Sequence, residues 1–123
     1  MNYVDNKKLE IVNGQIIALF LFIITLFVNI LLAYNEKLNL EDKKSFFDNE
    51  ESLIIAILNR IVVVILSIYF VYTTYIEKEI NNTDNIQLIA SILALIASLV
   101  GLYNLLRNYS ELKQNANSYD YSI

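Results

Sequence analysis

The feature that most constrains this chain is the stretch 85–106, NIQLIASILALIASLVGLYNLL, which contains no charged residue. An α-helix rises about 1.5 Å per residue and a bilayer core is about 30 Å thick, so a helix of this length is able to cross it. Two further apolar runs precede it, over 14–34 and 53–76. The sequence therefore predicts an all-α integral membrane protein. Its three transmembrane helices would form an up-down-up bundle, with a short amphipathic or irregular loop after the first.

Composition supports a membrane protein over a soluble helical bundle. Of the 123 residues, 56% are apolar and 18% are charged, whereas a soluble domain is about 45–50% apolar and about 25% charged. The excess of apolar residues is concentrated in the three runs. A soluble bundle helix would also show a polar face over much of its circumference, but here the polar arcs are narrow and consist of small or uncharged residues.

Several function classes are disfavoured by what the chain lacks. It has no Cys and no His, so it offers no thiol nucleophile, no thiolate metal site and no histidine base. The net charge of −4 argues against a nucleic-acid partner. No serine-hydrolase, zinc-protease or phosphate-loop motif occurs, and the acidic loop lacks the spacing of a calcium site. We therefore expect a protein that is not an enzyme and holds no cofactor or metal.

The first half of the chain divides into a polar N-terminal segment, a span and a loop. Residues 1–13 are polar and continue without a break into the first transmembrane helix, 14–34. A cleaved signal peptide is the alternative, but the apolar core is longer than the usual 7–15 residues. Residues 35–52 form an acidic charged loop, and Asp48 with Glu51 resembles a capping box that starts the next helix.

The second half of the chain is a helical hairpin followed by a tail. The second transmembrane helix covers 53–76 and stays helical to about residue 80. Residues 81–85, NNTDN, are a turn, after which Asp84 with Gln87 resembles a second capping box. The third transmembrane helix covers 86–106. The polar C-terminal tail, 107–123, is expected to be frayed or disordered from about residue 114.

Small residues follow one side of the third helix, where they would let another helix approach closely in lipid. We call this set the small-residue stripe; it consists of Ala90, Ala94, Ala97 and Gly101, with Asn104 in line. Leucine and isoleucine occupy the opposite side and are expected to face lipid. Similar narrow stripes occur in the first two spans, so we expect all three to face inward as the helix-packing surfaces of the bundle.

Four polar residues lie at a similar depth and form a candidate polar layer: Asn29, Asn59, Arg60 and Asn104. A charged residue within a span costs some 2.5–3.5 kcal/mol at the membrane centre and is a candidate functional site. Arg60 would either extend its side chain (snorkel) to the headgroups or join the helices by hydrogen bonds to Asn29 and Asn104. Otherwise it would bind an anionic lipid headgroup, a partner carboxylate or a permeating anion.

Charge balance gives an expected orientation. With three spans, the N-terminus and the NNTDN turn lie on one side, and the acidic loop and the C-terminus lie on the other. The second side carries more Lys and Arg, which are retained in the cytoplasm. We therefore expect a multi-pass protein of the cytoplasmic membrane with its N-terminus outside and its C-terminus inside. Frequent Ile, Asn and Lys suggest a bacterial source.

Packing chemistry without reaction chemistry favours a non-catalytic subunit or accessory protein. Its partners would be the lipid bilayer and another membrane protein or further copies of itself. The alternative is an oligomeric pore-forming or membrane-permeabilising protein, because in size, span number and expected orientation the chain is similar to three-span phage holins. It departs from them in lacking a basic run in its tail. A transporter component would show more broken helices than this chain predicts.

Overall fold

The computed structural model describes residues 3–81 and 85–121, and every regular element in them is an α-helix. The helices are α1 (Tyr3–Leu40), α2 (Asn49–Asn81) and α3 (Ile86–Tyr121). By length and composition, all three are able to cross a membrane. This confirms the predicted all-helical fold with three long apolar helices.

Helix α1 runs unbroken from the polar N-terminal segment through the first apolar run, because no proline interrupts it. It ends in a Schellman motif, in which the N–H of Lys43 donates to the carbonyl of Leu38 at 2.9 Å and the N–H of Asp42 donates to that of Asn39 at 3.2 Å. Asp42 takes the left-handed conformation, with φ of 56°, that this motif requires.

The acidic loop is shorter than expected. We expected it to cover 35–52, but α1 continues to Leu40 and α2 already begins at Asn49. Asp48 caps α2, since its Oδ1 accepts a hydrogen bond from the N–H of Glu51 at 2.7 Å. Both ends of the expected loop are therefore helical, and only 41–48 connect the two helices.

Helix α3 continues well past the third apolar run. We expected fraying from about residue 114, whereas the helix extends to Tyr121. No Gly or Pro follows Gly101, so nothing in the sequence stops the helix earlier. The expected capping pair at the start of α3 includes Asp84, which lies outside the described residues.

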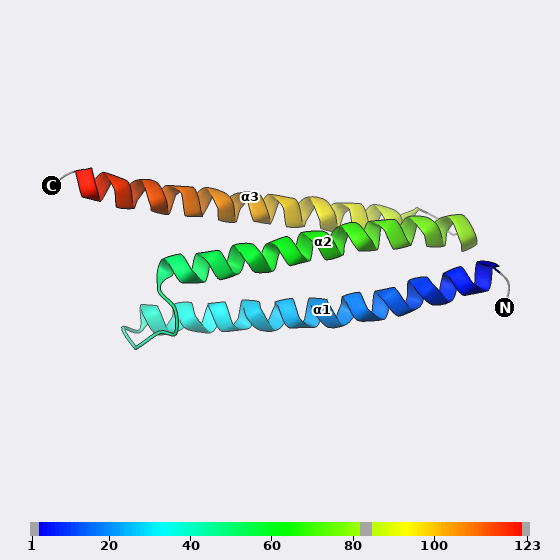
Figure 1. Ribbon diagram of the computed structural model, residues 1–123, viewed down its shortest axis with the longest axis horizontal. Coiled ribbons are helices and arrows are strands. Elements are labelled where there is room, and N and C mark those ends of the chain that lie inside the picture. The colour runs from blue at the N-terminus through cyan, green and yellow to red at the C-terminus, as the bar shows by residue number, and fades with distance from the viewer. Residues whose placement is uncertain (1–2, 82–84, 122–123) are drawn as a thin grey trace.

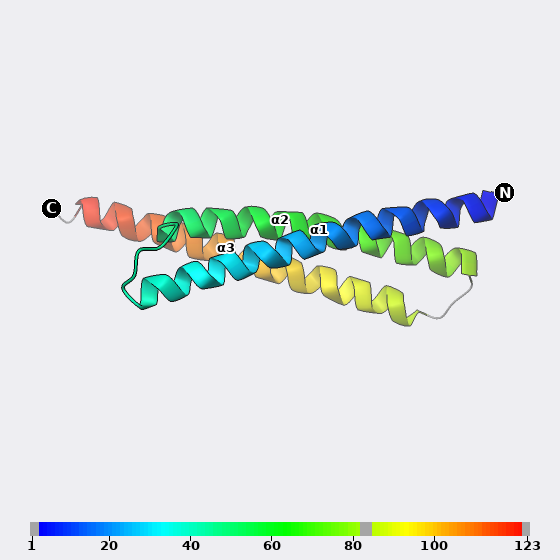
Figure 2. The same cartoon turned by 90° about the horizontal axis from the view of Figure 1, so that it is seen from below.

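Helix α2 lies between the other two helices, and each reverses the direction of the one before it (Figure 1). The N-terminal end of α1 and the C-terminal end of α2 lie at one end of the molecule, which we call the turn side. The 41–48 link and the C-terminal part of α3 lie at the other end, the loop side. A view from below shows α1 crossing the α2–α3 pair at an angle (Figure 2).

Helices α1 and α3 both pack on α2, but no Cα atoms of α1 and α3 approach within 8 Å in the described residues. The expected compact arrangement, with three stripes facing one another, is therefore wrong. Most apolar surface remains uncovered: only 11%, 17% and 6% of the most apolar segments of the three helices are buried within the chain. Such surface is typical of helices that face lipid or another protein.

Candidate groove between the outer helices

The side of α3 that packs on α2 differs from the one that the sequence predicted. Ala90, Ala94 and Ala97 of the small-residue stripe are exposed in the isolated chain, and only Gly101 is partly covered. The shielded positions follow a repeat of three and four residues about a quarter turn away. They are Leu88, Ser91, Leu95, Ser98, Leu102 and Leu105. This face consists of leucine and serine and packs on α2, and of the stripe only Gly101 contacts α2, through Arg60.

Two residues of the small-residue stripe, Ala90 and Ala94, instead line a groove that has α2 as its floor and α1 and α3 as its walls. We call it the α1–α3 groove, and it contains two hollows. The turn-side hollow, about 340 Å³, is lined by Phe22 of α1, Ser67, Phe70 and Thr74 of α2, and Ala90, Ser91 and Ala94 of α3. The loop-side hollow, about 540 Å³, is lined by all three helices as well. The groove exists because the outer helices do not meet.

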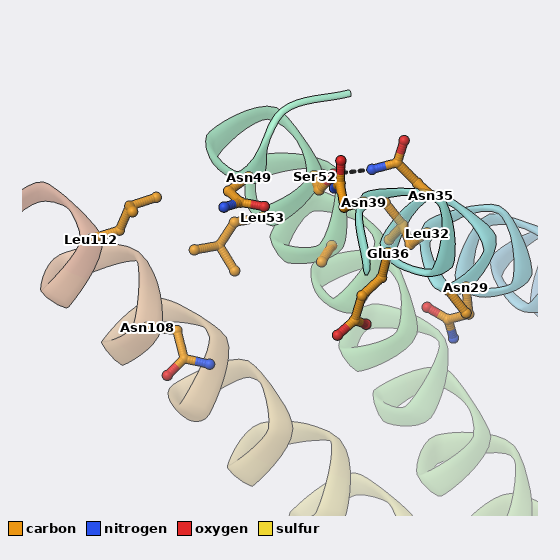
Figure 3. A pocket seen from close by; sticks show the side chains of 12 residues that line it. Asn29, Leu32, Asn35, Glu36, Asn39, Asn49, Ser52, Leu53, Asn108 and Leu112 are labelled. Atoms are coloured by element: carbon orange, nitrogen blue, oxygen red, sulfur yellow. Dashed lines mark hydrogen bonds between the residues drawn. The ribbon is translucent and has the colours of Figure 1, made fainter. Parts of the chain in front are cut away.

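The loop-side hollow is rich in amide side chains (Figure 3). Asn29, Glu36 and Asn39 reach it from α1, and Asn108 faces them from α3. Amide groups donate and accept hydrogen bonds, so this end of the groove offers polar groups beside the apolar side chains that also line it.

Asn35 also lines this hollow and forms four hydrogen bonds beside it. The sequence did not mark it as a site residue. The side chain is only 1% exposed. Its Oδ1 accepts hydrogen bonds from the N–H groups of Phe46 and Phe47 at 2.8 and 2.9 Å. Its Nδ2 donates to the carbonyl of Phe47 at 3.0 Å and to Oγ of Ser52 at 2.9 Å. One side chain thus ties α1, the link and α2 together.

Two members of the candidate polar layer are in direct contact. Nδ2 of Asn59 donates to Oδ1 of Asn29 at 2.9 Å and to the backbone carbonyl of Thr25 at 3.1 Å. These bonds join α2 to α1 within the apolar runs, in the part nearer the loop side, where an unpaired amide is costly. Farther towards the turn side, Gln15 makes a similar connection by donating to Thr73 and Glu77, at 3.2 and 3.0 Å.

The other two members, Arg60 and Asn104, are not joined to that pair. The Arg60 guanidinium lies against α3, where its Cζ and one Nη are 3.2 Å from the position that a Cβ on Gly101 would occupy. Within 3–81 and 85–121, Arg60 forms no hydrogen bond or ion pair, and Asn104 is exposed. The expected bonds from Arg60 to Asn29 and Asn104 are therefore absent from the described part of the chain.

Polar contacts also join α2 to α3 at both ends. The hydroxyls of Thr74 and Ser91 share a hydrogen bond of 2.9 Å. At the loop side, Nζ of Lys113 lies 2.7 Å from Oε1 of Glu50. The hydrogen bond and the charge of Glu50 raise the pKa of Lys113 above its ordinary value. These two contacts fix the register between the helices.

The chain matches no protein-family model, no curated protein and no solved structure.

Proposed function

We propose that the protein is a small non-catalytic subunit or accessory protein of the cytoplasmic membrane, which binds a transmembrane helix of another protein along the α1–α3 groove. In this proposal the three helices cross the bilayer in an up-down-up arrangement. The N-terminus lies outside, and the loop side lies in the cytoplasm, where the larger share of Lys and Arg is retained.

The observation that carries this proposal is the exposure of the small-residue stripe beside an open groove. Small side chains along a helix are the usual contact surface between helices in lipid, because they allow the backbones to come close. In this chain Ala90 and Ala94 line a hollow and have no helix of the same chain packed over them. A helix from outside the chain would cover them.

Site-directed crosslinking in native membranes tests the proposal, and the absence of Cys makes single-cysteine variants simple. Ala94→Cys carrying a short photoreactive maleimide should give one discrete adduct with a different membrane protein, at a fixed stoichiometry. Leu93→Cys is the matched control, because Leu93 is 60% exposed on the side of α3 turned away from α2. Equal adducts from both positions, or lipid adducts alone, would contradict a helix bound in the groove.

The second candidate is the oligomeric pore-forming, holin-like activity. It is favoured by the polar side chains of the loop-side hollow, since Asn29, Glu36 and Asn108 would line a channel if several copies met with their grooves inward. In that case the Ala94→Cys adduct would contain only copies of this chain. Induced expression would also collapse the membrane potential, which a subunit of another complex would not do.

A further inference from the structure

Arg60 is the one charged residue inside the apolar run 53–76, and it lies seven residues after Leu53. Its guanidinium is placed over Gly101, and it has no hydrogen-bond or ionic partner among the residues that the structure describes. A guanidinium is always charged and presents five donors, so in a low-dielectric environment it requires an acceptor.

The acceptor is not supplied by this chain at that depth. None of the three apolar runs contains Asp or Glu. Because Asn59 is bonded to Asn29, Arg60 lies level with about residue 28 of α1. The nearest carboxylate of the groove wall, Glu36, is therefore about 12 Å farther towards the loop side at 1.5 Å per residue.

The position of the guanidinium differs from that of a snorkelling arginine. It lies against Gly101 of α3, five residues before Leu106, where the third apolar run ends on the loop side. At 1.5 Å per residue this is about 7.5 Å inside the run.

Side chains lean towards the N-terminus of their helix, and the N-terminus of α2 is on the loop side. A snorkelling arginine would extend along this lean to reach the loop-side headgroups. The Arg60 guanidinium instead lies at the level of Gly101, so a headgroup phosphate is not the acceptor that its position fits.

We infer that Arg60 forms an ion pair with the carboxylate of an Asp or Glu located within the transmembrane helix that binds the groove. This inference rests on the proposed function and specifies the chemistry of the partner. Ionisable residues within membranes are usually paired with one another, and an arginine–carboxylate pair provides two parallel charge-assisted hydrogen bonds. The partner helix would place its acid level with Asn29 and Asn59, about 10 Å from the loop-side end of its span.

The test uses the full-length protein in phosphatidylcholine vesicles and a synthetic transmembrane peptide of leucine and alanine. One peptide carries a single Asp about 10 Å from one end, and two others carry Asn or Leu at that position. Energy transfer between labelled protein and labelled peptide gives the affinity. We expect the Asp peptide to bind about tenfold more tightly than the Asn peptide.

Arg60→Gln should remove this preference while leaving the binding of the Leu peptide unchanged. Lys78→Gln is the matched control, because Lys78 lies on the same side of α2 five helical turns away. It should preserve the preference. Helix content measured by circular dichroism confirms that both variants are folded.

Each other outcome overturns the inference in a recognisable way. Equal binding of all three peptides, unchanged by Arg60→Gln, would mean that the groove binds a helix without recognising a carboxylate. A preference that disappears when phosphatidylglycerol replaces part of the phosphatidylcholine would identify a lipid phosphate as the acceptor. Failure of every peptide to bind, together with equal adducts at Ala94→Cys and Leu93→Cys, would remove the proposed function as well.

Discussion

At the scale of single residues, Asn35 shows how one amide side chain connects the end of α1 to the link and to α2. It is buried, and both its donor and acceptor atoms are used. Its partners Phe46 and Phe47 lie in the link, which has no regular secondary structure to satisfy its backbone N–H groups. The hollow on the loop side therefore depends on a residue that the sequence marks only as the start of a polar segment.

Replacing Asn35 by Ala should lower the free energy of unfolding by about 2 kcal/mol, because two backbone N–H groups lose their acceptor. Equilibrium unfolding in mixed detergent micelles measures this change. Hydrogen exchange should also accelerate at the amides of Phe46 and Phe47. The control is Asn39→Ala, one turn along the same helix, where the side chain is exposed. Equal effects at both positions would contradict the role assigned to Asn35.

At the scale of helices, α2 uses different chemistry on its two sides. Towards α1 it forms hydrogen bonds through amide side chains: Asn59 donates to Asn29, and Gln15 of α1 donates to Thr73. The rings of Phe22 and Phe70 also pack there, with their centroids 5.4 Å apart. Towards α3 it packs against the leucine and serine face. Gly14 allows a close approach at the turn-side end, since a Cβ there would overlap the Tyr69 hydroxyl.

The Asn59→Leu substitution should loosen α1 from α2. It removes two hydrogen bonds between helices and leaves the Asn29 amide without this partner, at an expected cost of about 1 kcal/mol in a membrane environment. The same micelle unfolding experiment measures this cost. Asn104→Leu is the control, because Asn104 is exposed and should change stability little. A larger loss at Asn104 than at Asn59 would contradict this account of the α1–α2 contact.

At the scale of the whole molecule, the helices are longer than a bilayer core is thick. Helix α1 has 38 residues and α3 has 36, which correspond to about 57 and 54 Å, compared with about 30 Å for the hydrocarbon. Polar helical ends therefore extend beyond the length that a hydrocarbon core would cover. The loop side carries the ends of α1 and α3 together with the amide-rich hollow, so the proposed partner would have both a membrane surface and an aqueous surface to contact.

Cysteine labelling tests the proposed orientation. In intact cells, a membrane-impermeant maleimide should modify Asn6→Cys, because the proposed orientation places the N-terminal end of α1 outside. Ser110→Cys should react only after the membrane is permeabilised. Both positions are exposed in the isolated chain, so their access to reagent depends on the membrane alone. The opposite pattern would reverse the assignment of sides and place the loop-side hollow outside the cell.

The sequence by itself determined the three apolar helices, the cap at Asp48 and the absence of acids from the apolar runs, because each depends on local composition or on residues close together in the chain. Only the tertiary structure decided which face of α3 meets α2. The small-residue stripe and the leucine and serine face both repeat every three to four residues, so periodicity cannot choose between them. The choice depends on the shape of the opposing helix, as does the four-bond environment of Asn35, whose partners lie 11 to 17 residues away.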